Sequence, residues 1–161
     1  MKDSAEIFAS TETSDLIDHI LTRYHEVHRA DLASLVPLAE RVERVHSADP
    51  EAPKGLAQAL ATLAREMEDH MAREETILFP AMRSGGGMGS LHPIAVMRAD
   101  HDEHTESMVL IRQLTHDLTP PDHACGSWRS LYAGTATLLE ELAAHIALEN
   151  DVLFPRFGPA T

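Results

Sequence analysis

Residues 70–80 read HMAREETILFP, and residues 145–155 read HIALENDVLFP. Both segments fit the pattern His-x-x-x-Glu-x-x-(Ile/Val)-Leu-Phe-Pro. Residues four apart on a helix lie one above the other on the same face, so each segment can present a nitrogen and a carboxylate toward one point. The spacing alone is weak evidence, because a chain with 11 His and 26 acidic residues produces such pairs by chance. The surroundings of the two segments are more informative.

A further histidine precedes each segment at nearly the same distance. His25 lies 45 positions before His70, and His101 lies 44 positions before His145. Each half of the chain therefore offers one helix with a single His, followed by a helix with both His and Glu. The sequence predicts an internal repeat that includes the candidate functional residues.

Hydrophobic residues at helical spacing predict four amphipathic helices. The helices are expected at about 14–46, 53–82, 93–118 and 122–154, separated by the turn-forming stretches SADPEAP, SGGGMGS and Thr-Pro-Pro. Pro37 lies inside the first helix and is expected to kink or restart it, because proline removes a backbone donor. The prediction is an all-α, up-down-up-down four-helix bundle with an internal two-fold pseudo-repeat. It forms a single domain over 14–158, preceded by a polar lead at 1–13.

Composition narrows the range of partners. The chain has 161 residues with 13 Lys and Arg against 26 Asp and Glu, giving a net charge of -13. This charge repels phosphate backbones and anionic lipid, so neither nucleic acid nor a membrane is an expected partner. The first ten residues contain no signal-peptide pattern and no long apolar run follows, so the protein is expected to be cytoplasmic.

Cys125 is the only cysteine of the chain. An internal disulfide is therefore impossible, and a metal site must depend on imidazole and carboxylate instead of thiolate. We interpret Cys125 itself as a small, partly buried residue near the start of a helix.

Six polar residues interrupt the apolar stripes of the predicted helices. Buried imidazoles and carboxylates cost several kcal/mol when nothing compensates them, so the set indicates a cationic occupant. Imidazole with carboxylate suits iron, zinc or manganese. If each Glu spans two ions, each ion receives two His and a solvent-derived oxo or hydroxo bridge, and one position stays open for a small ligand such as O2 or NO. The six residues are His25, His70, Glu74, His101, His145 and Glu149.

The remaining histidines lie off these stripes or in loops. We interpret all but one of them as solvated, namely His19, His28, His92, His104, His116 and His123. The exception, His46, is considered below. Tyr24, next to His25, is interpreted as core packing or as an electron-transfer residue near the metal centre.

The two repeated segments resemble those of the hemerythrin-like (HHE cation-binding) proteins, most closely the repair-of-iron-centres branch, the di-iron proteins of iron-sulfur cluster repair. The stretches RYHEVHRADL at 23–32, VERVH at 42–46, PIAVMRADHDEH at 93–104 and LTPPDHACGSWRSLYAG at 118–134 are also similar to that branch. The resemblance covers nearly the whole chain from about Ser14.

By this resemblance the six residues are similar to the family's ligands of two iron ions in a non-haem, oxo-bridged centre. The centre is expected to bind NO or O2 and to help restore iron-sulfur clusters after nitrosative or oxidative damage by supplying labile iron, with iron-sulfur proteins as partners. His46 matches a further histidine of the branch and is either an additional ligand or an exposed residue at a helix end.

Three interpretations stay open. The first is a stress-response repair protein, with NO-reducing or other redox activity left open, and the second is an O2 or NO carrier, store or sensor of the hemerythrin type without turnover. Full-length members of the branch have an N-terminal domain with a cysteine pair, which this sequence is expected to lack, so functions that depend on those thiols are in doubt. The third, a ferritin-like oxidase, requires paired Glu-x-x-His motifs, and only Glu43-Arg-Val-His46 fits.

Overall fold

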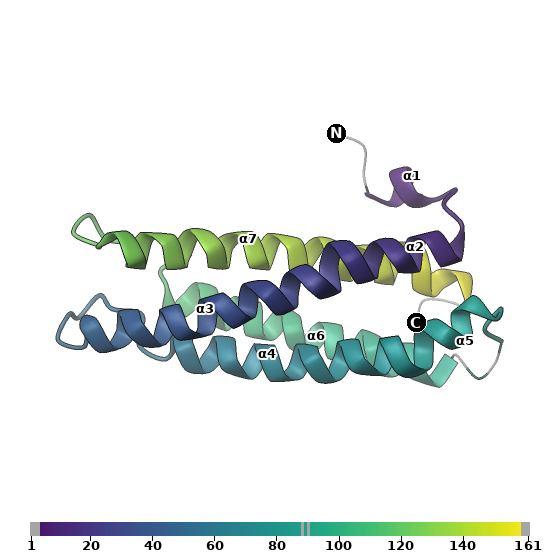
Figure 1. Cartoon of the computed structure of the whole chain (residues 1–161), viewed down its shortest axis with the longest axis horizontal. Coiled ribbons are helices and arrows are strands. Elements are labelled where there is room, and N and C mark those ends of the chain that lie inside the picture. Colours follow the sequence, from purple (N-terminus) through teal and green to yellow (C-terminus); the bar gives the residue numbers. More distant parts are fainter. Residues whose placement is uncertain (1–3, 88, 90, 159–161) are drawn as a thin grey trace.

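Four long helical rods lie side by side in the computed structural model, which describes residues 4–87, 89 and 91–158 (Figure 1). Most of the rods combine α-helix with a short wide turn of π-helix or a tight 3₁₀ turn. They are α2 (Thr13–Ile20), η1 (Leu21–His25) and α3 (Glu26–Val45); α4 (Leu56–Arg73), η2 (Glu74–Leu78) and α5 (Phe79–Arg83); α6 (Leu91–Leu114); and α7 (Gly126–Leu148), η4 (Glu149–Leu153) and η5 (Phe154–Arg156). The predicted all-α class is confirmed.

The rods follow one another around the bundle in chain order. Helix α3 packs against α4 and α7, α4 packs against α6, and α6 packs against α7. Short connections join consecutive rods, so neighbours run in opposite directions (Figure 1). This is the predicted up-down-up-down arrangement.

The first rod continues through Pro37. Of the two expected outcomes, a kink or a restart at Pro37, the restart does not occur. Proline costs the helix one hydrogen bond, but Leu35 and Ala39 on either side of it are buried in the core, and packing of an apolar face supplies most of a helix's stability.

The second rod begins at Leu56, three residues later than predicted, because Gly55 before it adopts a left-handed conformation with φ of 94°. The carboxylate of Glu43 on α3 accepts hydrogen bonds from the backbone N–H groups of Gly55 (2.6 Å) and Ala57 (3.0 Å). These are unpaired donors of a helix N-terminus, so Glu43 caps the neighbouring helix. That contact gives the Glu43-x-x-His46 motif a structural role.

The third helix ends at Leu114, before the predicted end at 118. His116, Asp117 and Leu118 all have positive φ values, between 50° and 57°, which no continuing α-helix allows. The fourth rod begins at Gly126, after the predicted start near 122, with Cys125 as its extended N-cap residue.

The polar lead contains a short helix, α1 (Ser4–Phe8). Phe8 packs against the apolar core of the bundle. The guanidinium of Arg156 donates hydrogen bonds to the carbonyls of Thr11 (2.7 Å) and Phe8 (3.2 Å). The described part of the lead is thus fastened to the end of the last rod.

Two separate apolar clusters fill the bundle, and they leave a polar layer between them. The larger cluster contains Leu35, Leu60 and Leu138 and extends toward the α3–α4 turn. The smaller contains Ile17, Phe79 and Phe154 near the two chain ends. The residues between these clusters along each rod are those that the sequence singled out.

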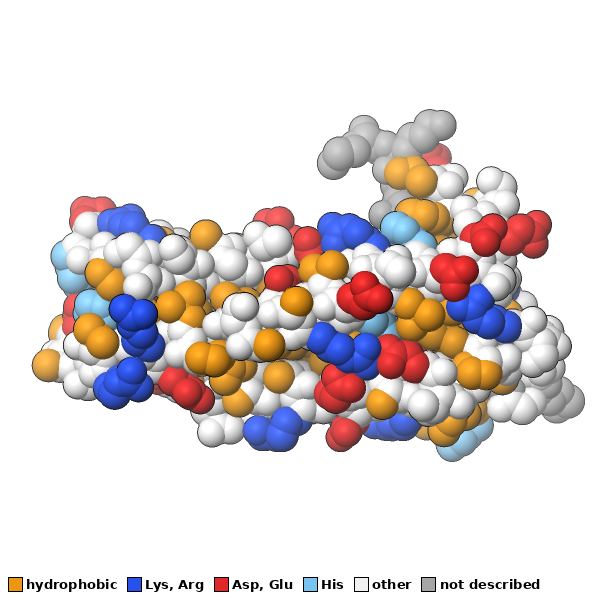
Figure 2. Space-filling view, in the orientation of Figure 1, with side chains coloured by type: hydrophobic (Ala, Val, Ile, Leu, Met, Phe, Trp, Pro, Cys, Tyr) orange, Lys and Arg blue, Asp and Glu red, His pale blue; other side chains and the backbone are white. Residues whose placement is uncertain are grey.

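The surface is mixed in character. Over α3 and α4, Figure 2 shows acidic and basic side chains interspersed with small hydrophobic areas. None of the described helices has the length and apolar character that crossing a bilayer would require.

Candidate metal centre

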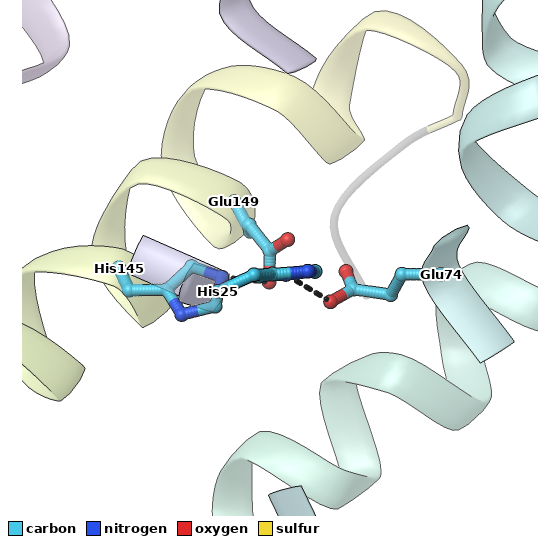
Figure 3. A group of neighbouring side chains, drawn as sticks. All are labelled: His25, Glu74, His145 and Glu149. Atoms are coloured by element: carbon cyan, nitrogen blue, oxygen red, sulfur yellow. Dashed lines mark ion pairs between the residues drawn. The ribbon is translucent and has the colours of Figure 1, made fainter. Parts of the chain in front are cut away.

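All six candidate residues meet at one level inside the bundle. His25 comes from the first rod, His70 and Glu74 from the second, His101 from the third, and His145 and Glu149 from the fourth. Four of them are drawn in Figure 3. Each of the six side chains is almost fully buried, with at most 2% of its surface exposed.

Three of the four rods widen into a π-helical turn at this level. His25 ends η1, Glu74 begins η2 and Glu149 begins η4. A wide turn inserts an extra residue and shifts the helix face, and such turns occur frequently at functional sites. Here each π-helical turn contains one of the six candidate residues at its first or last position.

Each glutamate lies between the candidate histidine of its own rod and that of the preceding rod. Oε1 of Glu74 is 3.3 Å from Nε2 of His25 and 3.1 Å from Nε2 of His70. Oε1 of Glu149 is 3.3 Å from Nε2 of His145 and 3.0 Å from Nε2 of His101. Both carboxylates can therefore reach two groups of imidazoles at once.

The donor atoms fall into two groups with metal-ligand spacing. One group contains His25, Glu74, His145 and Glu149, and the other contains His70, His101 and Glu149. Glu149 belongs to both groups, and Glu74 contacts His70 of the second group as well. The arrangement can accommodate a pair of cations bridged by two carboxylates.

Buried polar atoms at the centre lack hydrogen-bond partners. Although imidazole nitrogens lie 3.0–3.3 Å from Oε1 of each glutamate, these contacts lack hydrogen-bond geometry. Both carboxylate oxygens of Glu74, both of Glu149, and Nε2 of His25 and of His145 therefore make no hydrogen bond. Buried polar groups are nearly always hydrogen-bonded, because an unsatisfied one costs about 1–3 kcal/mol. Six such atoms facing one another fit divalent or trivalent cations.

The buried carboxylates and imidazoles shift one another's pKa values. Burial lowers the pKa of His70, but Glu74 and Glu149 outweigh it and raise the pKa to about 11. Burial likewise opposes the charged form of His25, yet Glu74 raises its pKa. Burial raises the pKa of Glu149, whereas the surrounding histidines hold it well below the ordinary value. The ionised carboxylate is the form that binds a metal.

A second layer of side chains orients all four histidines. Nδ1 of His25 is 2.7 Å from Glu75, and Nδ1 of His101 is 2.8 Å from Asn150. Glu75 and Asn150 each follow a candidate bridging glutamate, so they occupy equivalent places in the two halves. An acceptor at Nδ1 fixes the tautomer and leaves Nε2 free for a metal.

The other two histidines have different partners. Nδ1 of His70 is 3.1 Å from the carboxylate of Asp100, and Nδ1 of His145 is 3.2 Å from Nε2 of His28. All four imidazoles thus present Nε2 to the glutamates and Nδ1 to the second layer.

The prediction that His28 and His104 are solvated is wrong. His28 is 0% and His104 2% exposed, and both lie beside the candidate ligands. The ring centre of His104 is 5.2 Å from that of His70. Burial lowers the pKa of both residues to about 3, so both are neutral.

The sequence contained a signal for this pair. His28 follows His25 by three positions and His104 follows His101 by three, so the spacing is part of the internal repeat and places each pair on one helix face. The partners Glu75, Asp100 and Asn150 had no comparable signal, because charged and amide residues near helix surfaces are common.

Tyr24 lies at the edge of the second layer. Its ring stacks on that of His145, with ring centres 5.1 Å apart and planes 4° from parallel. It therefore packs directly against a candidate ligand and is partly exposed at the surface.

His46 is not brought to the cluster. Its Nε2 is 3.2 Å from the sulfur of Cys125, and its ring packs on Trp128 in the larger apolar cluster. Cys125 is exposed, not partly buried as predicted. Of the other histidines predicted to be solvated, His19 is partly exposed and His92, His116 and His123 are exposed.

Comparison with known proteins agrees with the family resemblance seen in the sequence. The family model described as Hemerythrin HHE cation binding domain matches residues 16–157. The chain is 45% identical over 147 residues to proteins named iron-sulfur cluster repair protein YtfE from Escherichia coli O1:K1 / APEC, from Escherichia coli strain SMS-3-5 / SECEC and from Escherichia fergusonii. The matched segment is 91% of this chain and 67% of each relative.

Proposed function

This chain belongs to the hemerythrin HHE cation-binding family, and from this premise we propose that it holds two iron ions and acts in the repair of damaged iron-sulfur clusters. The observation that supports the proposal most directly is the set of six buried, unpartnered donor atoms between the two apolar clusters. We propose His25, His70, His101 and His145 as terminal ligands, and Glu74 and Glu149 as bridging ligands.

Iron is the occupant that best fits the proposed activity. A mixed imidazole and carboxylate set binds several first-row metals, so the donor atoms do not select iron by themselves. The similarity to proteins named for iron-sulfur cluster repair favours iron. When bound, a pair of iron ions would supply redox chemistry and could bind NO or O2.

The protein's own residues perform three tasks in this proposal. The glutamates keep the ions close together, the second-layer acceptors hold each imidazole with Nε2 inward, and the apolar clusters on either side exclude water from the centre. Tyr24, stacked on His145 and partly exposed, lies where an electron would pass between the centre and the surface.

Metal content is the first test. Iron per chain is measured after anaerobic loading with Fe²⁺, together with the absorption spectrum of the oxidised protein. We expect two irons and oxo-to-iron charge-transfer bands. A single zinc in protein purified from its native host, with no iron bound on loading, would overturn the proposal.

Repair is tested with a protein whose iron-sulfur cluster has been damaged by NO. Loaded protein should restore the cluster, whereas the Glu149→Leu variant should not. The His46→Leu variant is the matched control, because His46 lies away from the centre. Stoichiometric NO or O2 binding without any cluster recovery would instead favour a carrier, store or sensor, and multiple equivalents of nitrous oxide would show enzymatic turnover.

A further inference from the structure

We infer that the two metal positions hold their ions unequally, and that the position served by His25 and His145 releases its ion first. The inference rests on the proposed function, because it takes the cluster to hold two ions. It comes from the second-layer residues. These residues make a similar number of hydrogen bonds to the histidines at the two positions, but they carry different charges.

At the position of His70 and His101, both imidazoles face oxygen acceptors. The carboxylate of Asp100 lies 3.1 Å from Nδ1 of His70, and the amide oxygen of Asn150 lies 2.8 Å from Nδ1 of His101. The nearest basic group, Arg73, is 3.7 Å from Asp100 and about half exposed. A carboxylate behind an imidazole makes that imidazole a stronger ligand, and among the described contacts Asp100 accepts no bidentate guanidinium.

At the position of His25, the second-layer carboxylate is paired directly with a guanidinium. Glu75 lies 2.7 Å from Nδ1 of His25, and the guanidinium of Arg29 donates to both of its oxygens, at 2.9 and 3.0 Å. The same guanidinium also donates to both oxygens of the more exposed Glu68, at 2.8 and 3.1 Å, so the two carboxylates share its charge. A bidentate guanidinium is among the strongest partners that a carboxylate can have. Glu75 therefore orients His25 while contributing less negative charge to it than Asp100 contributes to His70.

His145, the other ligand of this position, has no oxygen acceptor behind it. When its Nε2 binds a cation, its proton must reside on Nδ1, and Nε2 of His28 must accept the hydrogen bond. Neutral His28 then has its own proton on Nδ1, which is buried and has no partner. An unsatisfied buried donor behind His145 opposes this arrangement, whereas Nδ1 of His70 and Nδ1 of His101 each face an oxygen acceptor.

The functional consequence is stepwise release. One ion leaves while the other keeps Glu74, Glu149, His70 and His101 in place, so the chain can give up iron without emptying its core. A supplier of iron to damaged clusters needs an ion that is held but transferable.

The test measures iron release to an excess of a coloured Fe²⁺ chelator from the anaerobically loaded chain. We expect two phases of equal amplitude, with rates at least about tenfold apart, since second-layer partners typically change metal affinity by about 10- to 100-fold. The Asp100→Asn variant should accelerate only the slow phase. The Arg29→Met variant leaves Glu75 unpaired and fully charged toward His25, so it should slow only the fast phase.

The Arg65→Met variant is the control, because Arg65 lies one turn before Glu68 on α4 and its side chain donates only to the hydroxyl of Thr62 among the described hydrogen bonds. It should change neither phase. Release of both irons in one phase, or Asp100→Asn accelerating the fast phase, would overturn the inference while leaving the two-iron proposal intact. Loaded protein with fewer than two irons would overturn the two-iron proposal itself, and the inference with it.

Discussion

Nε2 of His28 lies 3.2 Å from Nδ1 of His145, and the two rings stack with their centres 5.2 Å apart. This contact joins the first and fourth rods by two buried imidazoles inside the bundle. The pair is expected to make the metal-free protein sensitive to acid.

The His28→Gln variant should reduce that sensitivity. Folding lowers the pKa of His28 from 6.5 to about 3, so between these values the unfolded chain binds more protons and stability falls as pH falls. At pH 5, which is 1.5 units below the unfolded pKa of 6.5, the free energy of unfolding should be lower by about 2 kcal/mol, because each pKa unit corresponds to about 1.36 kcal/mol. Urea unfolding of the metal-free forms at pH 7.5 and pH 5 measures it. The exposed His116→Gln variant should behave as the parent protein does, and an unchanged pH response in His28→Gln would contradict the expectation.

Metal affinity should rise with pH. In the metal-free protein the facing carboxylates raise the pKa of His70 to about 11, so near neutral pH its imidazole is protonated and must lose a proton when Nε2 binds an ion. One displaced proton changes affinity about tenfold per pH unit, and His25, whose pKa is also raised, adds to this. Competition with a chelator of known affinity between pH 6 and 8 gives the slope. A flat profile would show that the histidines do not exchange protons for metal.

Loss of a bridging glutamate should cost more iron than loss of a distant histidine. The Glu74→Leu and Glu149→Leu variants remove the group that faces histidines of both positions, so each is expected to retain fewer than half of the irons bound by the parent. The His46→Leu variant should keep both irons, because His46 contacts Cys125 and Trp128. Iron analysis after desalting compares the three, and equal retention in all of them would refute the assignment.

The contact of Arg156 with the lead segment should protect that segment from proteolysis. Its guanidinium bonds the carbonyls of Phe8 and Thr11 and the hydroxyl of Thr13. A hydrogen bond to a charged group contributes on the order of 1.5–3 kcal/mol at most, so loss of all three should loosen the segment. In the Arg156→Met variant, cleavage by thermolysin near Ile7 and Phe8 should become faster while the bundle stays intact. Equal cleavage rates in the two proteins would mean that the contact does not hold the segment.

The sequence by itself determined the class of fold and the six central residues. Periodic apolar residues specify helices, because one face of a helix must be buried, and the positions of Pro and Gly separate the four rods. The repeat of His, Glu and Leu-Phe-Pro then located polar residues on faces that had to be inward. A helix fixes which side chains share a face, so Glu74 could be placed with His70 without coordinates.

Only the tertiary structure decided which residues contact the Nδ1 atoms of the candidate ligands and which lie away from the centre. Asp100, Asn150 and Glu75 reach the imidazoles from neighbouring rods, and such contacts depend on rod orientation and on the π-helical turns that shift each face by a residue. The repeat placed His28 on the face of His25, but its contact with His145 on another rod depended on packing, as did the place of His46 at the far end of the larger apolar cluster. Spacing along one helix defines a direction, whereas a partner across the bundle is defined only when the rods are packed together.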